Sequence, residues 1–268
     1  MRVHAIRTGS LVGNKTFMRG TGFGAALRRR EDYEFPVFAY LLEHSEGAIM
    51  IDAGLGNRYP PLRPMRRMFP LPRFGEGDDI GAQMRRAGLD PAEVRRVVLT
   101  HLHPDHVGGV DAFAGAEILV HRRELDFATS ARGRPVYWPS RWPAFEPIRF
   151  DLDPEPYGPF PESKVLTASG DVRLVPIPGH AIGQVGVVVE TEPARLFFSA
   201  DHTLRQQWFL EDESAGRVGM VSRAASKRLG VKTSRRIHDF VTSAPTVLVP
   251  SHDDEAPGRL ARMEPIAF

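Results

Sequence analysis

Apolar residues occur in short runs along this chain, separated by polar, glycine-containing or proline-containing turns. Short runs that alternate with period two, or that are continuously apolar, are typical of β-strands. Three polar residues separate two such runs, at residues 36–43 and 47–51, and predict a hairpin. The full set of expected strands is residues 3–11, 36–43, 47–51, 97–100, 117–121, 173–177, 184–191, 195–199 and 246–250.

Helical patterns lie between and after these strands. Residues 78–87 form an expected helix that ends at Gly88. Asp90 followed by Pro91 is typical of an N-cap with proline at the first helical position, and it predicts a short helix. Further helices are expected at residues 123–129, 214–229 and 234–242. This mixture of strands and helices favours an α/β (α+β) fold in which helices flank two sheets.

Residues 135–161 are dense in both proline and aromatic side chains. The prolines argue against regular structure, and the aromatic content argues against a solvated linker. We interpret this segment as a lid, inserted at about residues 131–162 into a single domain that spans residues 1–268. The loop at residues 59–74, which contains Met65, Met68 and Phe69, is a second candidate for a pocket rim or a dimer contact.

The composition limits the chemistry. Of the 268 residues, 42% are hydrophobic and 25% charged, which allows a sizeable core and excludes disorder as the main state. The absence of cysteine excludes disulfide scaffolds, thiolate metal ligands and thiol nucleophiles, so any metal must be held by carboxylates and by some of the ten histidines. A net charge of only +2 gives no indication of a nucleic-acid partner. Without a signal-peptide pattern or a long apolar run, we expect a cytoplasmic protein that does not enter a membrane.

One segment carries the pattern of a metal site. His101-Leu102-His103-Pro104-Asp105-His106 follows directly after the expected strand at residues 97–100. In an extended or tightly turning backbone, positions i and i+2 can project to one side, so His101 and His103 can share one ion. Asp105 and His106 could then address a second ion, and Gly108-Gly109 would let the chain turn sharply behind the site. A surface turn accounts for a lone histidine, but not for three histidines and an aspartate in six positions. With only nitrogen and oxygen ligands available, zinc is the natural choice.

Three more candidate ligands come shortly after other expected strands. His180 follows the strand at residues 173–177, Asp201 the strand at 195–199, and His252 the strand at 246–250. Asp52 likewise follows the strand at residues 47–51. Strand ends deliver such side chains to one rim of a sheet, so we interpret these residues as one set.

In this order, the motif at residues 101–106 with His180, Asp201 and His252 resembles the metallo-β-lactamase superfamily, and the strand pattern extends the resemblance over nearly the whole chain. The resemblance implies an αββα sandwich of two mixed β-sheets with a dinuclear zinc site at one edge, although Fe, Mn or Co can take the place of zinc. It implies that Asp201 bridges the two ions and that Asp52 orients a ligand from behind. The implied ligands are His101, His103 and His180 for the first ion and Asp105, His106 and His252 for the second.

Such a site predicts hydrolysis. Two ions about 3.5 Å apart can hold a hydroxide aimed at a bound carbonyl. Asp105 is the expected catalytic residue, because it can hydrogen-bond this hydroxide and pass a proton to the leaving group. The resemblance associates a bridging carboxylate with the lactonases, thioesterases and phosphodiesterases of the superfamily. Residues 121–125, 178–184 and 251–253 look most like the N-acyl-homoserine lactonases, which act in quorum quenching, so a small-molecule lactone or ester is the expected substrate.

The sequence departs from those lactonases at one position. Many of them have a tyrosine three residues after the bridging aspartate, where this chain has Leu204. Either His202, Tyr137 or Tyr157 replaces the missing hydroxyl, or the substrate is different. For His202, a hydrogen bond behind the ligands is the simpler interpretation.

The aromatic side chains of the lid have two interpretations. They form an apolar wall for an acyl chain, or they pack the lid onto its own domain or into the interface of a homodimer. The candidate pocket residues are Tyr137, Trp138, Trp142, Phe145 and Leu204.

The sequence argues against two other functions. A nuclease of the same fold would need a basic groove, whereas the arginines of this chain are scattered among acidic residues. A metal-stabilised binding module without activity would not need seven intact ligands.

Overall fold

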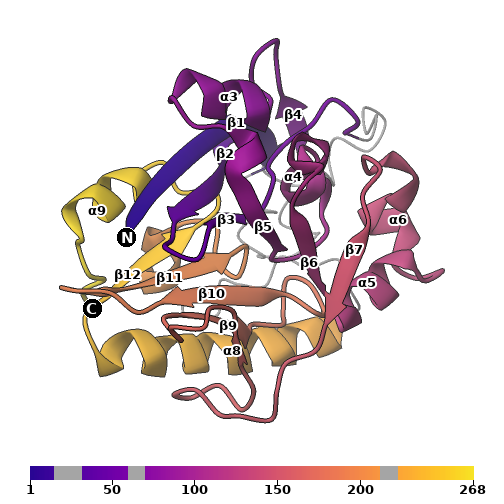
Figure 1. The fold of residues 1–268 in the computed structure, drawn as a ribbon. Helices are drawn as coiled ribbons and strands as arrows, with labels where there is room; N and C mark the ends of the chain where they lie inside the picture. The colour runs from indigo at the N-terminus through magenta and orange to yellow at the C-terminus, as the bar shows by residue number, and fades with distance from the viewer. Residues whose placement is uncertain (15–31, 60–69, 212–222) are drawn as a thin grey trace.

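The computed structural model describes residues 1–14, 32–59, 70–211 and 223–268. These residues form two mixed sheets that pack face to face, as Figure 1 shows. The seven-stranded sheet has the order β4 (Leu71–Arg73), β1 (Arg2–Asn14), β2 (Asp32–Glu43), β3 (Ala48–Ile51), β5 (Val94–Leu99), β6 (Glu117–His121) and β7 (Pro147–Phe150). The five-stranded sheet has the order β12 (Thr246–Pro250), β11 (Arg195–Ala200), β10 (Val185–Val189), β9 (Val172–Pro176) and β8 (Lys164–Val165).

Helices cover the outer faces of both sheets (Figure 1). The longest described helix, α8, lies along the five-stranded sheet, and α3, α4, α5 and α6 lie around the seven-stranded sheet. The α-helices are α3 (Ile80–Arg86), α4 (Pro104–Val107), α5 (Arg122–Thr129), α6 (Arg134–Tyr137), α7 (Gln206–Glu211), α8 (Arg223–Ser243) and α9 (Ala256–Arg262), and the 3-10 helices are η2 (Pro91–Glu93), η3 (Val110–Phe113) and η4 (Pro139–Arg141).

Three apolar layers hold this arrangement together. A central cluster, with Tyr40 of β2 and Phe198 of β11 at its middle, fills the space between the sheets. A second cluster packs Met84 of α3 and Leu125 of α5 against the outer face of the seven-stranded sheet. A third packs Phe240 of α8 onto the five-stranded sheet. The layers are therefore helix, sheet, sheet and helix, which confirms the expected αββα sandwich.

Strand direction brings the candidate site together. Strands β3, β5 and β6 are parallel neighbours, so their carboxyl ends meet at one edge of the seven-stranded sheet. In the other sheet β10 is antiparallel to both β9 and β11, and β12 is parallel to β11, so β9, β11 and β12 also end at a common edge. Asp52 and His101 follow β3 and β5, and His180, Asp201 and His252 follow β9, β11 and β12, as the sequence predicts.

Most expected elements are confirmed, including the hairpin of β2 and β3 and the Asp90 cap, whose side chain accepts a hydrogen bond from the Ala92 backbone N–H at 2.9 Å. The expectation that residues 135–161 lack regular structure is wrong. They contain α6, η4 and β7, which pairs in parallel with β6. Proline is compatible with this strand because Pro147 is its first residue and β7 lies at the edge of the sheet.

The expected break between helices at residues 229–234 is also wrong, because α8 runs without interruption from Arg223 to Ser243. Ile237, Phe240 and Val241 on its inner face are buried against the five-stranded sheet. This burial outweighs the cost of about 1 kcal/mol for Gly230 inside the helix. Residues 214–222 of the expected helix lie outside the described residues, as do Met65, Met68 and Phe69.

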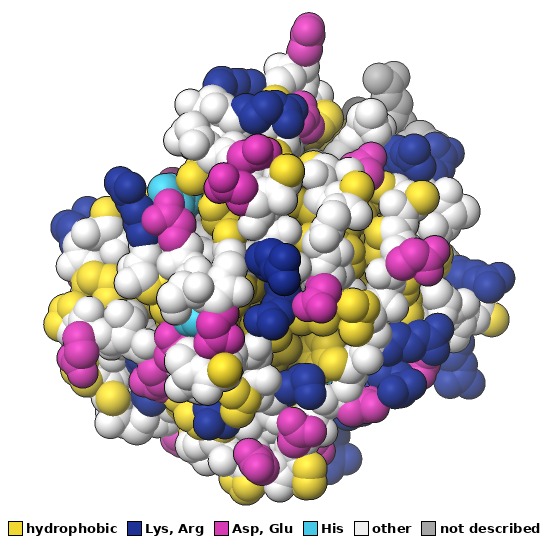
Figure 2. Space-filling model, in the orientation of Figure 1, with side chains coloured by type: hydrophobic (Ala, Val, Ile, Leu, Met, Phe, Trp, Pro, Cys, Tyr) yellow, Lys and Arg dark blue, Asp and Glu magenta, His cyan; other side chains and the backbone are white. Residues whose placement is uncertain are grey.

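Acidic and basic side chains are interspersed on the face shown in Figure 2, as the small net charge leads one to expect. None of the described helices combines the length and the hydropathy that crossing a membrane requires.

Candidate metal centre

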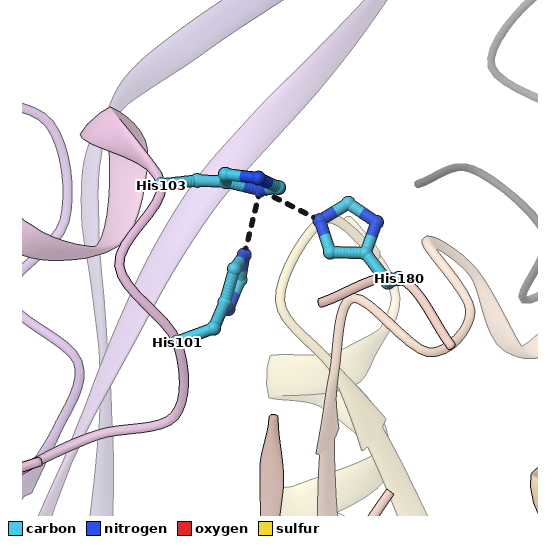
Figure 3. Close-up of side chains that lie close together, drawn as sticks. All are labelled: His101, His103 and His180. Atoms are coloured by element: carbon cyan, nitrogen blue, oxygen red, sulfur yellow. Dashed lines mark hydrogen bonds between the residues drawn. The ribbon is translucent and has the colours of Figure 1, made fainter. Parts of the chain in front are cut away.

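Three histidines from both sheets form the first cluster. His101 follows β5, His103 precedes the first turn of α4, and His180 lies between β9 and β10 (Figure 3). The Nδ1 atom of His103 lies 3.0 Å from Nε2 of His101 and 2.8 Å from Nε2 of His180. Three ring nitrogens thus converge on one point, as the sequence predicts.

The second cluster lies next to the first and contains two carboxylates. Nε2 of His252 lies 3.4 Å from Oδ2 of Asp105 and 3.2 Å from Oδ2 of Asp201. Nε2 of His106 lies 3.3 Å from Oδ1 of Asp201 and 3.7 Å from Oδ2 of Asp105. All four residues are at most 7% exposed.

Asp201 connects the two clusters. Its Oδ2 atom is also 3.5 Å from Nε2 of His180, a member of the first cluster. The preceding residue, Ala200, has a φ of 46° in the left-handed region, which non-glycine residues rarely adopt. This strained turn at the end of β11 directs the Asp201 carboxylate between the clusters.

In the second cluster, the ring nitrogens of His106 and His252 that face away from the cluster are held by the protein. Nδ1 of His106 lies 2.8 Å from Oδ2 of Asp52, and Nδ1 of His252 lies 2.8 Å from the carbonyl oxygen of Pro36. Asp52 in turn accepts hydrogen bonds from the backbone N–H and the hydroxyl of Thr100, both at 2.8 Å. Metal-binding histidines in proteins are typically oriented in this way, with Nε2 left for the ion.

The residues present fit a divalent ion in each cluster. Among the described residues, Nε2 of His106 and Oδ1 of Asp201 are buried and have no hydrogen-bond partner. Buried polar atoms are rarely left unpaired, and imidazole nitrogens with carboxylate oxygens are the donor set that zinc binds. The ligand atoms in each cluster lie within 4.8 Å of one another. Both clusters therefore could hold a metal ion.

The electrostatics of the two clusters differ. In the first, burial lowers the pKa of His101 well below its usual value and lowers that of His103 to about 3, and it also lowers the pKa of His180. Neutral imidazoles keep a lone pair available for a metal ion.

In the second cluster, burial lowers the pKa of both imidazoles, but the neighbouring carboxylates outweigh it. The pKa of His252 rises to about 10 and that of His106 also rises, in both cases mainly because of the Asp201 charge. Burial opposes charge on Asp201 too, yet His252 and His106 hold its pKa well below the usual range. Positive charge is therefore favoured at this point, whether protons or a metal ion supply it.

Gly108 has a different role from the sharp turn that we expected. Its φ of −61° is accessible to any residue. A Cβ atom built on it would lie 2.4 Å from the backbone nitrogen of Gly56 and 2.9 Å from the carbonyl oxygen of Gly54. Glycine is therefore required because the segment behind Asp52 passes directly against the end of α4.

Three of the five candidate pocket residues, Tyr137, Trp142 and Phe145, pack in one apolar cluster. Tyr137 is buried and its ring lies 4.7 Å from that of His103. Trp142 and Phe145 pack against the apolar cluster of the seven-stranded sheet, and the Trp142 indole N–H donates to the Tyr137 carbonyl oxygen at 3.0 Å. Trp138, which stands between α6 and η4, has a left-handed φ of 45°.

Two other candidates near Asp201 turn away from the ligand atoms. The Leu204 side chain packs with Phe35 and Trp208 in a small cluster of its own. Nε2 of His202 lies 2.9 Å from the Ser234 hydroxyl of α8, and burial lowers the pKa of His202 to about 3. Neither offers a hydroxyl at the position of the lactonase tyrosine.

Glu124, a buried carboxylate in the first turn of α5, was not predicted from the sequence. Burial raises its pKa to about 7, although backbone N–H groups of Gly183 and Leu102 bond to it. Between two arginines and a leucine, it reads as an ordinary solvated helix residue. The polar pattern of a helix does not reveal a buried charge whose partners come from distant loops.

Comparison with known proteins agrees with this geometry. A sequence model of the metallo-beta-lactamase superfamily matches residues 32–252. The N-acyl homoserine lactonase AttM of Azorhizobium caulinodans is 30% identical over 224 residues, which cover 76% of this chain and 78% of that protein. An N-acyl homoserine lactonase of a Bacillus species is 26% identical over 230 residues, 83% of either chain.

Solved structures show the same fold. An N-acyl homoserine lactone hydrolase with the product N-hexanoyl-L-homoserine at its catalytic metal centre has a TM-score of 0.72 with this chain. The two are 20% identical, and the match covers 94% of this chain and 93% of that one.

Proposed function

The chain belongs to the metallo-β-lactamase superfamily, and we propose that it hydrolyses a lactone or related carboxylic ester with two zinc ions. The observation that carries this proposal is the position of Asp201, whose carboxylate lies within 3.5 Å of His180 in one cluster and within 3.3 Å of His106 in the other. A shared carboxylate is the arrangement that holds two ions close together.

Each ligand has an assigned role in this proposal. Three neutral imidazoles would hold the first ion, two imidazoles and a carboxylate would hold the second, and the Asp201 carboxylate lies between the two clusters. The assigned ligands are His101, His103 and His180 for the first ion and Asp105, His106 and His252 for the second. Asp52 orients the His106 ring through the 2.8 Å contact at Nδ1.

When bound, two divalent ions provide a water-derived nucleophile at neutral pH and positive charge for the developing oxyanion. The chain supplies the proton transfer. The Asp105 carboxylate belongs to the second cluster, and we assign to it the proton taken from water and returned to the leaving oxygen. Burial of the surrounding ligands keeps bulk water from competing for these contacts.

An N-acyl-homoserine lactone is the substrate that the relatives support best. Seventy-six per cent of this chain aligns with a lactonase at 30% identity, and the pattern at residues 178–184 agrees with that class. The alternative is another ester, thioester or phosphodiester, and one observation favours it. Leu204 is buried with Phe35 and Trp208, so it contributes no hydroxyl to a lactone carbonyl.

Metal analysis tests the ligand assignment. We expect close to two zinc ions per chain after loading and dialysis, and fewer in His180→Ala. His4→Ala is the matched control, since His4 lies on β1, where it pairs with Glu43, and belongs to neither cluster. A loaded wild-type protein with one ion or none would contradict the dinuclear assignment.

A substrate panel tests the reaction. It compares acyl-homoserine lactones of several chain lengths with aryl esters, thioesters and phosphodiesters, each before and after chelation. We expect zinc-dependent ring opening to exceed all other turnover. Phosphodiester cleavage without lactone hydrolysis would replace the proposal by the alternative. The expected homodimer stays a prediction, which analytical ultracentrifugation would test.

A further inference from the structure

Glu124 is a fully buried carboxylate outside the two ligand clusters. It lies in the first turn of α5 and has 0% exposure, whereas Arg122 and Arg123 beside it are exposed. A carboxylate in this position requires compensation, because removing a charge from water costs several kcal/mol. Hydrogen bonds donated by N–H groups to both of its oxygens provide this compensation.

The two oxygens bond to two different loops. Oε1 accepts a hydrogen bond from the backbone N–H of Leu102 at 3.2 Å, and Oε2 accepts one from the backbone N–H of Gly183 at 2.9 Å. Leu102 stands between His101 and His103, after β5 of the seven-stranded sheet. Gly183 stands three residues after His180, before β10 of the five-stranded sheet. One side chain thus connects the ligand loops of both sheets.

The His180 loop lies directly on the first turn of α5. A Cβ atom on Gly183 would be only 2.3 Å from the backbone nitrogen of Glu124, so any larger residue would push the loop away. His121, at the start of the same helix, places Nδ1 at 2.8 Å from the Gly183 carbonyl oxygen. Both polar backbone atoms of Gly183 are therefore held from α5.

The surroundings of His103 are packed as well. Tyr137 of α6 is 0% exposed, and its ring packs against the His103 ring with an interplanar angle of 36°. Through its bonds to Leu102 and Gly183, Glu124 is connected to the loops of all three histidines of the first cluster.

We propose that Glu124 is a positioning residue that sets the separation of His101 and His103 from His180, and so the zinc affinity of the first cluster. This inference rests on the ligand assignment of the proposed function. Zinc–nitrogen bonds tolerate deviations of only about 0.2 Å, so the loops must keep a fixed spacing. Both oxygens of the carboxylate are needed, because two N–H groups from different loops require two acceptors.

Glu124→Gln tests this role with little change in shape. The amide keeps one acceptor and places an NH₂ group against the other N–H donor, which loosens one loop from α5. Glu93→Gln is the control, since Glu93 is exposed in η2. Zinc affinity is measured on metal-free proteins by competition with a chromogenic chelator, and the ligand geometry is read from the visible spectrum after cobalt loading.

We expect Glu124→Gln to weaken the first-cluster zinc affinity by roughly 10- to 100-fold and to alter the cobalt spectrum, whereas Glu93→Gln matches the wild type. Equal affinity and an unchanged spectrum in Glu124→Gln would overturn the inference. If the variant does not fold without metal, Glu124→Asp decides, because it keeps the charge but is too short to reach both loops. Wild-type affinity in that variant would equally overturn the inference. A wild-type protein that binds no zinc would instead contradict the proposed function.

Discussion

Replacing Gly108 by alanine should separate two backbone segments behind the candidate site. The added Cβ would meet the Gly56 nitrogen at 2.4 Å, the Pro104 oxygen at 2.7 Å and the Gly54 oxygen at 2.9 Å. Ordinary contact begins near 3.4 Å, so relief requires a backbone shift of about 1 Å. All three obstacles are backbone atoms, which no rotamer change can move aside.

The shift breaks specific contacts, and their number sets the cost. The Gly108 N–H donates to the Gly54 oxygen at 3.0 Å, and the Ala53 N–H donates to the His106 oxygen at 2.7 Å. Two such hydrogen bonds contribute about 1 kcal/mol each, and overpacking adds about 1–3 kcal/mol. The free energy of unfolding should therefore fall by about 3–5 kcal/mol, and Tm by roughly 6–20 °C. Because the same shift moves His106 relative to Asp52, zinc binding to the second cluster should weaken as well.

Gly115→Ala is the matched control. Gly115 has open space around its Cβ position and does not have a left-handed φ, so the same substitution should leave stability within about 0.5 kcal/mol. Both variants are compared with the wild type by urea unfolding of the metal-free protein, followed by zinc titration. A Gly108→Ala protein that unfolds at the wild-type urea concentration would show that the close approach does not require glycine.

Three further outcomes are expected. Asp105→Asn should lower kcat by roughly 100- to 10,000-fold while Tm stays near the wild-type value, and undiminished kcat would remove its role in proton transfer. Partial burial raises the pKa of Asp171, but hydrogen bonds from Ser169, Thr167 and His44 outweigh it and lower the pKa to about 2 from 3.8. At pH 6 the free energy of unfolding of the wild type should thus exceed that of Asp171→Asn by about 1 kcal/mol, a value reduced because Asp171 is partly exposed to solvent. Urea unfolding at a series of pH values should show this difference disappearing as the pH falls from 3.8 toward 2. Zinc at a hundredfold excess over Kd should raise the free energy of unfolding by about 2.7 kcal/mol over the chelated protein, and an unchanged Tm would mean that zinc does not bind the folded state.

The meeting of these histidines and carboxylates was predictable because strand ends have a fixed place in a sheet. His101, Asp201 and His252 each come shortly after an apolar run, and the structure brings them to one edge of the sandwich. The pattern of apolar residues therefore carries information about where polar side chains meet. The same pattern accounts for the confirmed strands and for the two observed clusters, whose role as metal ligands stays a prediction.

Contacts between distant backbone segments could not be predicted in this way. Glu124 has the sequence context of a surface residue, and Gly108 has that of a turn. Their actual roles depend on Gly183 and Gly56, which are 59 and 52 positions away in the chain. Local sequence pattern and propensity describe only neighbouring residues. The burial of Glu124 and Gly108 therefore becomes visible only when distant segments pack together in the fold.

The two clusters depend on different properties of the protein. The first contains only imidazoles that burial keeps neutral, so its affinity for a metal ion depends on how exactly His180 is held opposite His101. The second cluster contains two carboxylates, Asp105 and Asp201, of which Asp201 also approaches the first cluster. These carboxylates attract positive charge even when the geometry changes. Loosening a loop should therefore affect the first cluster more, and neutralising a carboxylate should affect the second more. Two variants separate these effects. Glu124→Gln should change the loop spacing without altering a proposed ligand, whereas Asp105→Asn should change the charge of a proposed ligand without moving a loop.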